Sequence, residues 1–298
     1  MKVLVLGGSG MLGHKLWQTL APRFDAWVTV RGGPAEYSRF GIFEETRVFG
    51  NVSVEDFESV TRVFASVKPD VVVNCIGLVK QEAAAGDPIA SSTVNSLFPL
   101  RLAQYARDAG ARLIHLSTDC VFSGRAGNYS ESDPPDAEDL YGRTKLLGEL
   151  HEDHCLTIRT SMIGRELRGS HGLLEWFLSQ NGKAVRGFRR AIFSGLTTPV
   201  LAEVIATVIA GHPDLNGIWH VAGGPISKFD LLTIVKQTYG LAIEIQPDET
   251  FVCDRSLDGS RFRNVTGFRA PSWSEMIGSM RADATPYDQF RRANDTQR

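Results

Sequence analysis

Two side chains with complementary acid–base chemistry, Tyr141 and Lys145, lie four residues apart. Residues at this spacing share one face of a helix, so the lysine ammonium would lie near the phenol. A cation about 4 Å away contributes roughly 4 kcal/mol at an effective dielectric near 20, enough to lower the phenol pKa from its usual value of about 10. With Ser117-Thr118-Asp119 upstream, the pair predicts a site where Tyr141 protonates a carbonyl oxygen during its reduction. An exposed amphipathic helical turn would show the same spacing.

A glycine-rich segment follows the first apolar segment of the chain. Residues 2–6 are expected to form a strand that leads directly into Gly7-x-x-Gly10-x-x-Gly13. Gly7 permits a tight turn, Gly10 lets a pyrophosphate approach the backbone, and Gly13 lets the next helix lie close to the sheet. The amino terminus of that helix would face the anion. The segment therefore predicts a dinucleotide site, and an ordinary glycine turn is the alternative.

Apolar segments alternate with helical patterns through the first half of the chain. This order predicts an α/β fold with a doubly wound parallel sheet of the Rossmann type. Ligands bind beyond the carboxyl ends of the strands in such sheets, and Gly7, Arg31, Gly77, Thr118 and Ser161 occupy those positions. The predicted strands are 2–6, 26–30, 47–49, 71–75, 113–117 and 156–160, and the predicted helices are 12–20, 54–67, 93–109 and 141–151.

The second half of the chain has a less regular pattern. We expect residues 1–165 to form the dinucleotide-binding domain and residues 166–298 mainly a smaller α/β substrate-binding domain, partly interleaved with the first. The polar, unpatterned end of the chain is expected to be a mobile tail. The predicted segments are a connection at 182–190, helices at 200–209 and 228–239, a strand at 218–221, a basic segment at 255–269 and the tail at 282–298.

The composition narrows the class of partner. The 298 residues carry a formal net charge of −2, with 43% hydrophobic and 22% charged residues. Nucleic-acid binding needs clustered lysine and arginine, so this balance argues against nucleic acid and favours small molecules. No apolar run approaches the roughly 20 residues that cross a bilayer, and the first strand leaves no room for a signal peptide. We therefore expect a cytoplasmic protein without a membrane partner, as a monomer or a homodimer.

The cysteines and histidines do not form a metal-binding pattern. The four cysteines are far apart and include no Cys-x-x-Cys pair, so we expect reduced thiols. The segment His151-Glu152-Asp153-His154-Cys155 lacks the spacing of a zinc-binding helix, and a solvated helix end explains it better. We predict no metal site.

The residue after the second predicted strand bears on the choice of cofactor. NAD-binding members of this fold place an acidic residue there, whereas this chain has Arg31. A guanidinium suits a 2′-phosphate, so NADPH is predicted, with NADH as the alternative cofactor and an exposed surface arginine as the alternative role. Asn51 is placed near the adenine. The remaining predicted cofactor contacts are Ser9, Met11, Leu12, Val52, Cys75, Ile76, Gly77 and Ser117.

Four motifs together carry a family resemblance. They are Gly7-x-x-Gly10-x-x-Gly13, Ser117-Thr118-Asp119-Cys120-Val121-Phe122-Ser123-Gly124, Tyr141-Gly142-Arg143-Thr144-Lys145-Leu146-Leu147-Gly148-Glu149 and Ile158-Arg159-Thr160-Ser161. Over most of its length the chain resembles an extended short-chain dehydrogenase/reductase and is similar to the dTDP-4-dehydrorhamnose reductase family. The resemblance implies that Thr118 holds the sugar C4 carbonyl, that Tyr141 donates the proton, and that Lys145 binds the nicotinamide ribose and lowers the tyrosine pKa. The hydride would come from NADPH.

The chain departs from the family pattern in the sugar pocket. Cys120 and Met162 stand where the family typically has tyrosine and tryptophan, and the stretch from Cys75 to Gln81 also differs. These differences leave the hexose open. Lys15 occupies the position of a glutamate that bridges a dimer through a metal in some members, and a cation there argues against such a bridge. The predicted substrate residues are Thr118, Asp119, Cys120, Ser161, Met162 and, as a grip for a diphosphate, Arg255, Phe262 and Arg263.

The resemblance favours one activity over three others. It implies NADPH-dependent reduction of the 4-keto group of a nucleotide-linked 6-deoxyhexose, in deoxysugar or polysaccharide biosynthesis. A dehydratase is disfavoured because Cys120 stands where elimination needs a better proton donor. An epimerase on the same scaffold and a regulatory subunit that binds NADP without turnover remain alternatives. An exposed basic loop is the alternative for the segment that carries Arg255 and Arg263.

Overall fold

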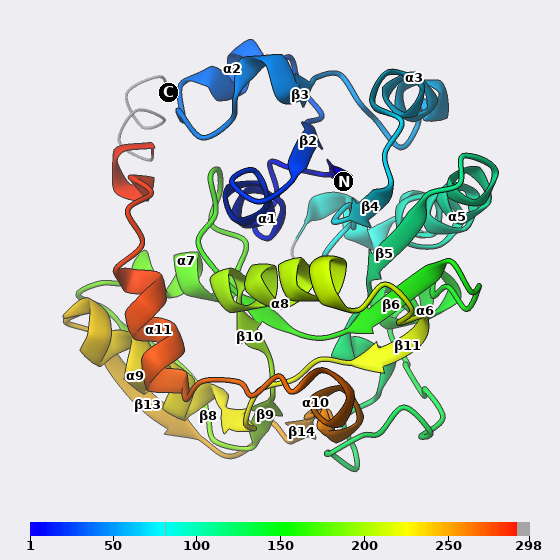
Figure 1. Ribbon diagram of the computed structural model, residues 1–298. Helices are drawn as coiled ribbons and strands as arrows, with labels where there is room; N and C mark the ends of the chain where they lie inside the picture. The colour runs from blue at the N-terminus through cyan, green and yellow to red at the C-terminus, as the bar shows by residue number, and fades with distance from the viewer. Residues whose placement is uncertain (81, 291–298) are drawn as a thin grey trace.

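The computed structural model describes residues 1–80 and 82–290, and Figure 1 shows a parallel sheet at its centre. Seven strands form this sheet in the order β11-β6-β5-β4-β1-β2-β3, and every neighbouring pair is parallel. This arrangement confirms the predicted doubly wound α/β fold. The strands are β1 Lys2–Leu6, β2 Asp25–Thr29, β3 Val48–Phe49, β4 Val71–Asn74, β5 Arg112–Leu116, β6 Cys155–Arg159 and β11 Gly217–His220.

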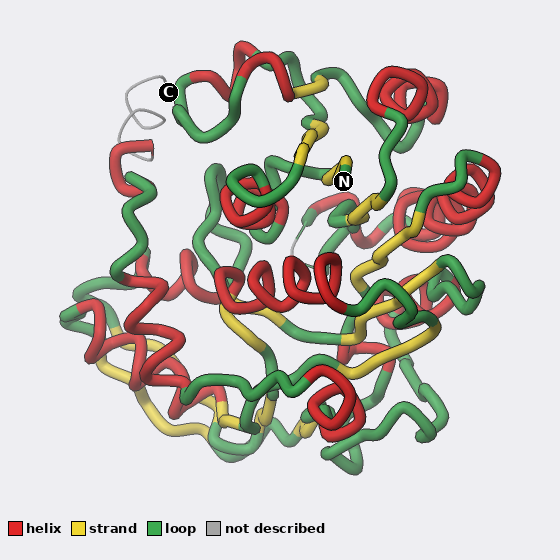
Figure 2. Tube along the Cα trace, viewed as in Figure 1, coloured by secondary structure: helices red, strands yellow, loops and turns green. Residues whose placement is uncertain are grey.

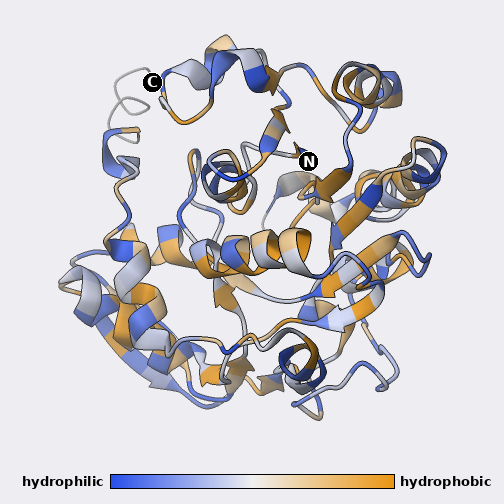
Figure 3. Cartoon of the chain, in the orientation of Figure 1, coloured by the Kyte–Doolittle hydropathy of each residue, from blue (hydrophilic) through white to orange (hydrophobic). Residues whose placement is uncertain are grey.

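Alternate residues of β1 point to opposite faces of the sheet, as the strand period of two requires. Val3 and Val5 belong to the core that includes α1 (Gly13–Leu20) and α8 (Thr198–Gly211). Leu4 and Leu6 belong to the other core, together with α3 (Phe57–Val67) and α5 (Phe98–Asp108). The sheet is therefore buried on both faces, and Figures 2 and 3 show helices and hydrophobic residues on its two sides.

The remaining helical segments of the first half lie mainly in the connections that follow the strands. The predicted helix at 93–109 is a π-helical turn, Thr93–Leu97, followed by α5. The predicted helix at 141–151 is α6, which begins at Leu140 and ends at Leu147. The other elements are α2 Ala35–Ser38, α4 Pro88–Ser92 and the 3-10 turns Glu45–Arg47, Ala83–Gly86 and Asp119–Val121.

The second half of the chain builds three small sheets and returns β11 to the main sheet. The small sheets have the orders β10-β7, β12-β9-β14 and β13-β8. Because β11 pairs with β6, the two halves share one sheet. The other elements of the second half are β7 Met162–Ile163, α7 Leu173–Leu178, β8 Ala184–Phe188, β9 Ala191–Phe193, β10 Leu196–Thr197, β12 Ile226–Ser227, α9 Lys228–Tyr239, β13 Glu244–Asp248, β14 Cys253–Asp254, α10 Ser260–Thr266 and α11 Trp273–Arg281.

Two segments of this half are more regular than predicted. The predicted connection at 182–190 contains β8, in which buried and more exposed residues alternate and which pairs with β13 about sixty residues later. The basic segment at 255–269 contains α10, whose Phe262 is buried. The predicted connection was wrong because its glycine and arginine content concealed a short alternating pattern, and the helix in the basic segment was missed because it has a single apolar anchor.

The predicted mobile tail is largely a docked segment. Asp283 forms an ion pair with Lys15, the hydroxyl of Tyr287 lies 2.7 Å from His14 Nε2, and Phe290 packs edge-on against Phe40 at 4.8 Å between ring centroids. Residues 282–290, drawn in red in Figure 1, therefore dock against α1, α2 and the residues that follow α2. The expectation was wrong for this part, and residues 291–298 lie outside the described residues. Within residues 1–80 and 82–290, no helix has the length and apolar content to cross a membrane.

Candidate active site

The turn after β5 and the start of α6 bring Thr118 and Tyr141 together. Thr118 accepts a hydrogen bond from the Cys120 backbone N–H at 3.1 Å and so caps the 3-10 turn. Asp139 caps α6 by accepting from the Gly142 N–H at 2.8 Å. A Cβ atom on Gly142 would lie 2.2 Å from the Cys120 carbonyl oxygen. Glycine at this position therefore lets α6 pack directly against the turn that holds Thr118.

The Tyr141 phenol lies near Thr118, whose hydroxyl influences its pKa. Burial raises the pKa of Tyr141, the nearby Cys120 and Asp119 raise it further, and the Thr118 hydroxyl opposes this. The net shift is upward, so the phenol is protonated at neutral pH. A phenol with a raised pKa can give up its proton only to a strong base that forms beside it.

The Lys145 ammonium binds a backbone carbonyl oxygen rather than the Tyr141 hydroxyl. Its Nζ donates to the Leu116 carbonyl oxygen at 2.6 Å and lies 3.5 Å from His115 Nε2. Burial lowers the pKa of Lys145 to about 8, while Glu149 opposes the shift. Lys145 is not among the groups that lower the pKa of Tyr141, so the predicted acidification of the phenol by Lys145 is wrong for this structure. The sequence spacing could not show that a backbone carbonyl competes for the ammonium.

A buried ion pair links the chain segments that carry the site. Arg159 at the end of β6 binds Glu149 through two contacts of 2.8 and 2.7 Å, and both side chains are almost fully buried. Ser117 donates to the same carboxylate at 2.6 Å. The pair therefore ties the end of β5, the end of β6 and the segment after α6 together. Sequence reasoning quoted Glu149 and Arg159 only as parts of motifs and missed this role.

The glycine-rich loop after β1 has the shape of a pyrophosphate cradle. Gly7 has φ +82°, and the Gly10 N–H donates to its carbonyl oxygen at 3.0 Å. A Cβ atom on Gly13 would lie 2.2 Å from the same oxygen, so only glycine fits. Gly10 is exposed, Ser9 and Met11 are half-buried, and Leu12 is in the core. The loop therefore offers its backbone rather than the Leu12 side chain to a dinucleotide.

The loops after β2 and β3 bring two predicted cofactor residues to neighbouring positions. The Asn51 N–H donates to the Gly32 carbonyl oxygen at 2.9 Å, and Asn51 has a left-handed φ of 56°. Arg31 and Asn51 are exposed, whereas Val52 is buried. The exposed Arg31, which also interacts electrostatically with Glu55, is accessible to a phosphate beyond the end of β2.

The loop after β4 lies directly beside the glycine-rich loop. The Cys75 N–H donates to the Leu6 carbonyl oxygen at 3.0 Å, and a Cβ atom on Gly7 would lie 3.0 Å from Ile76 Cγ1. Gly77 is exposed next to them. Burial raises the pKa of Cys75 to about 12, so its thiol is protonated. This is the point where the strand order reverses, and such points bind dinucleotides in doubly wound sheets.

The predicted substrate residues divide into two groups. Arg255 Nη1 lies 3.6 Å from Cys120 Sγ, and Arg255 also donates from Nε to the Phe122 carbonyl oxygen at 2.8 Å. Burial raises the pKa of Asp119 and raises that of Cys120 to about 12. The structure therefore brings Asp119, Cys120 and Arg255 together beside Thr118 and Tyr141.

Ser161 and Met162 follow β6, where the Ser161 carbonyl oxygen accepts from Leu196 at 3.0 Å and Met162 belongs to β7. Phe262 is turned into the core, where it packs against Trp219 with 6.3 Å between ring centroids. It anchors α10 to β11 and has no exposed surface for a substrate. Arg263 is an exposed residue of α10, and no contact joins it to Cys120 or Tyr141 among the residues that the structure describes.

Three polar residues near the site were not predicted. Lys80 Nζ donates to Asp139 at 2.6 Å and lies 5.7 Å from the centroid of the Tyr141 ring. Lys228 interacts electrostatically with Asp119 and Cys120. Asp139 could have been recognised as a helix cap before residue 140. No local pattern in the sequence distinguishes Lys80 or Lys228 from surface lysines.

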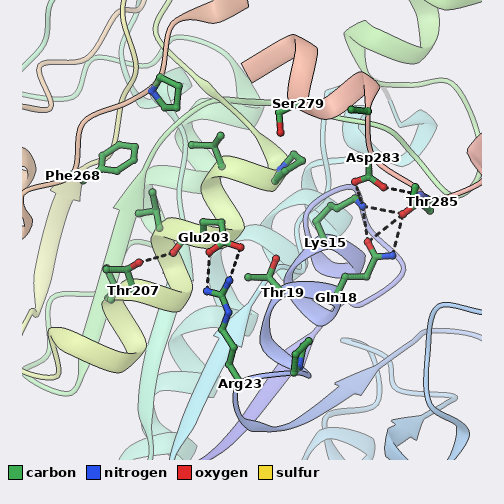
Figure 4. Close-up of a pocket in the computed structure, with 18 of the residues that line it drawn as sticks. Lys15, Gln18, Thr19, Arg23, Glu203, Thr207, Phe268, Ser279, Asp283 and Thr285 are labelled. Atoms are coloured by element: carbon green, nitrogen blue, oxygen red, sulfur yellow. Dashed lines mark hydrogen bonds and ion pairs between the residues drawn. The ribbon is translucent and has the colours of Figure 1, made fainter. Parts of the chain in front are cut away.

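A cavity of about 1200 Å³ lies elsewhere, between α1, α8 and the docked segment 282–290. Figure 4 shows its polar side, where Lys15 contacts Gln18, Asp283 and Thr285, and Arg23 pairs with Glu203. Thr118, Tyr141 and Lys145 do not line it. Within the described part of the chain, no group of three or more His, Cys, Asp or Glu side chains could hold a metal ion.

The chain is similar in sequence and in structure to several known proteins. The chain is 28% identical over 255 residues to the dTDP-4-dehydrorhamnose reductase of Escherichia coli K12, covering 79% of this chain and 77% of the relative. It is 33% identical over 149 residues to the mouse methionine adenosyltransferase 2 subunit beta, covering 50% of this chain and 41% of the relative. A solved structure of a hypothetical dTDP-4-dehydrorhamnose reductase from Sulfolobus tokodaii has a TM-score of 0.77 and 26% identity, covering 92% and 98% of the two chains.

The match to a protein family extends over nearly the whole chain. Residues 1–285 match the RmlD substrate binding domain family. This match includes both halves of the chain and all four motifs that carry the resemblance. The predicted assignment to the extended short-chain dehydrogenase/reductases, and with it to their NAD(P)-dependent oxidoreductases, is confirmed at the level of the family. The chain belongs to the RmlD substrate binding domain family.

Proposed function

We propose that the protein reduces the 4-keto group of a nucleotide-linked 6-deoxyhexose with NADPH. The observation that carries this proposal is the protonated Tyr141 phenol beside Thr118, at the end of the strand next to β4. When bound, NADPH would supply the hydride to the carbonyl carbon. The glycine-rich loop supports a dinucleotide there, because side chains at Gly7 and Gly13 would fill the space that its backbone needs.

Each residue of the site would have a different role in a carbonyl reduction. The Thr118 hydroxyl can donate a hydrogen bond to the carbonyl oxygen and fix its position. Tyr141 can then give its proton to the alkoxide, which is more basic than the phenol even with its raised pKa. Lys145 lies one helical turn away, and with a pKa of about 8 it is largely protonated at neutral pH, so its ammonium can bind a ribose hydroxyl. Asp119 and Cys120 would line the sugar side.

Arg31 supports NADPH over NADH as the cofactor. Its guanidinium is exposed at the end of β2, where the fold places the adenosine ribose. A 2′-phosphate carries negative charge that an arginine binds strongly, whereas a 2′-hydroxyl gains little from it. Asn51 and Val52 would lie beside the adenine from the loop after β3. We place the cofactor side in residues 1–165, the substrate side mainly in residues 166–298, and the activity in deoxysugar or polysaccharide biosynthesis.

The test is consumption of NADPH in the presence of a panel of 4-keto nucleotide sugars with dTDP, UDP and GDP as the nucleotide. We expect one or more of them to be reduced, with a single C4 epimer as the product by NMR. Interconversion of the two C4 epimers of a 4-hydroxy nucleotide sugar, without net oxidation of NADPH, would show an epimerase instead.

A second candidate function is a regulatory subunit that binds NADP without turnover. The similarity to the mouse methionine adenosyltransferase 2 subunit beta over 149 residues favours it. The two candidates differ in one measurable outcome. Tight NADPH binding by calorimetry together with no consumption of NADPH for any sugar in the panel would favour the regulatory subunit. Separately, the molar mass of the protein, measured by light scattering, would show whether it is a monomer or a homodimer.

A further inference from the structure

Three cations surround the Cys120 side chain on the substrate side of Tyr141. Arg255 lies 3.6 Å from the thiol, and Lys80 and Lys228 are close enough to interact with it electrostatically. Two carboxylates, Asp119 and Asp139, balance only part of this charge. Lys80 pairs with Asp139 at 2.6 Å, and Arg255 lies 3.8 Å from the same carboxylate. The site thus has more positive than negative charge, although the whole chain has a formal net charge of −2.

Lys228 is the member of this group without an oxygen partner. Its ammonium lies 3.7 Å from the centroid of the Phe193 ring, with which it forms a cation–π contact. Across the residues that the structure describes, no acceptor lies within hydrogen-bonding distance of it and no carboxylate forms an ion pair with it. An ammonium has three donors. Its protein partners are the Phe193 ring and, at longer range, the Asp119 carboxylate, so an added anion would gain charge-assisted hydrogen bonds from it.

The small sheet β12-β9-β14 explains why Lys228 and Arg255 face the same region. Ser227 of β12 and Asp254 of β14 both pair with Ile192 of β9. Lys228 and Arg255 each come one residue later, on opposite sides of β9. The Lys228 ammonium lies over the Phe193 ring, and both Lys228 and Arg255 interact electrostatically with Asp119 and Cys120, so the two cations face the same region. Two strand spacings separate their backbones by roughly 10 Å, so the two side chains approach this region from different strands.

We propose, on the basis of the function proposed above, that Lys228 is a substrate-binding residue that holds the diphosphate of the nucleotide sugar together with Arg255. A diphosphate carries the negative charge that this cationic region lacks, and sugar hydroxyls do not. Binding there places the anomeric end of the sugar beside Cys120 and leaves its far side toward Thr118 and Tyr141. The cofactor phosphates have a separate place at the glycine-rich loop of β1, so the two anionic groups do not compete.

The experiment measures binding of dTDP and UDP by titration calorimetry to the full-length protein saturated with NADPH. The variants are Lys228→Met, Lys228→Arg and Lys183→Met, which removes an exposed lysine before β8. Methionine keeps the unbranched stem that packs on Phe193 and removes the charge. We expect Lys228→Met to weaken nucleoside diphosphate binding about tenfold or more, Lys228→Arg to restore most of it, and Lys183→Met to bind like the unmodified protein.

The affinity for NADPH, measured separately by fluorescence, should be the same in all four proteins. Equal binding of dTDP and UDP by Lys228→Met and the unmodified protein would overturn the inference, as would no binding of either by the unmodified protein. A loss of NADPH affinity in Lys228→Met would also overturn it, because Lys228 would then serve the cofactor. Binding of dTDP or UDP that depends on Lys228, without reduction of any 4-keto sugar, would instead reject only the proposed reaction.

Discussion

Gly142 lies so close to the Cys120 carbonyl oxygen that an added Cβ atom would be 2.2 Å from it. This contact sets the distance between α6, which carries Tyr141, and the turn that carries Thr118. Alanine at this position would have to push the helix away from the turn. The relative placement of Tyr141 and Thr118 thus depends on the absence of a side chain at Gly142.

The Gly142→Ala variant should lose both stability and activity. Overpacking of this kind destabilises by about 1–3 kcal/mol, which exceeds the roughly 1 kcal/mol that alanine gains over glycine in a helix. Urea denaturation and kcat/KM would measure the two effects. The matched control is Gly278→Ala in α11, where, among the described residues, no heavy atom outside the neighbouring residues and the local helix backbone lies within 4 Å of the added Cβ. That variant should be neutral or slightly stabilised, and equal effects at both positions would contradict the packing argument.

The Tyr141→Phe variant should lose turnover by roughly 10²-fold or more and keep its affinity for NADPH. Only the proton donor is removed, because phenylalanine retains the ring that packs beside Lys80. Steady-state kinetics with a reducible sugar and calorimetry with NADPH would measure the two quantities. Turnover within a few-fold of the unmodified protein would remove Tyr141 from this role.

The Arg31→Asp variant should shift the cofactor preference from NADPH toward NADH. The change replaces a partner for the 2′-phosphate by a carboxylate, which repels that phosphate and accepts a hydrogen bond from a 2′-hydroxyl. The measurement is the ratio of the dissociation constants for the two cofactors, with Arg31→Met separating loss of attraction from added repulsion. An unchanged ratio in both variants would show that Arg31 does not contact the ribose.

The buried Lys145 should make stability rise with pH in alkaline solution. Burial lowers its pKa from 10.5 to about 8 in the folded protein, so between these values the unfolded chain binds more protons than the folded chain. The free energy of unfolding therefore increases with pH in this window. We expect the difference between the unmodified protein and Lys145→Met to grow in favour of lysine from about pH 8 to 10.5. A difference that stays constant across the window would show that Lys145 titrates normally.

Local patterns predicted the elements that carry the site well. The strand β1 and the glycines that follow it are defined by neighbouring residues, so both could be predicted from the sequence. The proximity of Thr118 and Tyr141 could also be predicted from the order of strands and helices. The direction of the Lys145 ammonium could not, because the Leu116 carbonyl that binds it is 29 residues away.

Long-range pairing explains the other differences between sequence and structure. The strand β8 is stabilised by β13 rather than by its own residues. The position of Lys228 beside Cys120 depends on the register of two short strands with β9. The alternation in β8 is too short to be recognised without its partner strand, and a single lysine at the start of a helix looks the same whether or not it faces a ligand.

The attachment of residues 282–290 to α1 and α2 has a practical consequence for work with shortened forms of the protein. Tyr287 and Phe290 complete a small apolar cluster with Tyr37 and Phe40, and Asp288 binds Arg165 at 2.7 Å. A truncation at residue 281 would uncover that cluster and leave Lys15 without its carboxylate. Such a fragment should be prone to aggregation, whereas one that ends after Phe290 would retain these contacts.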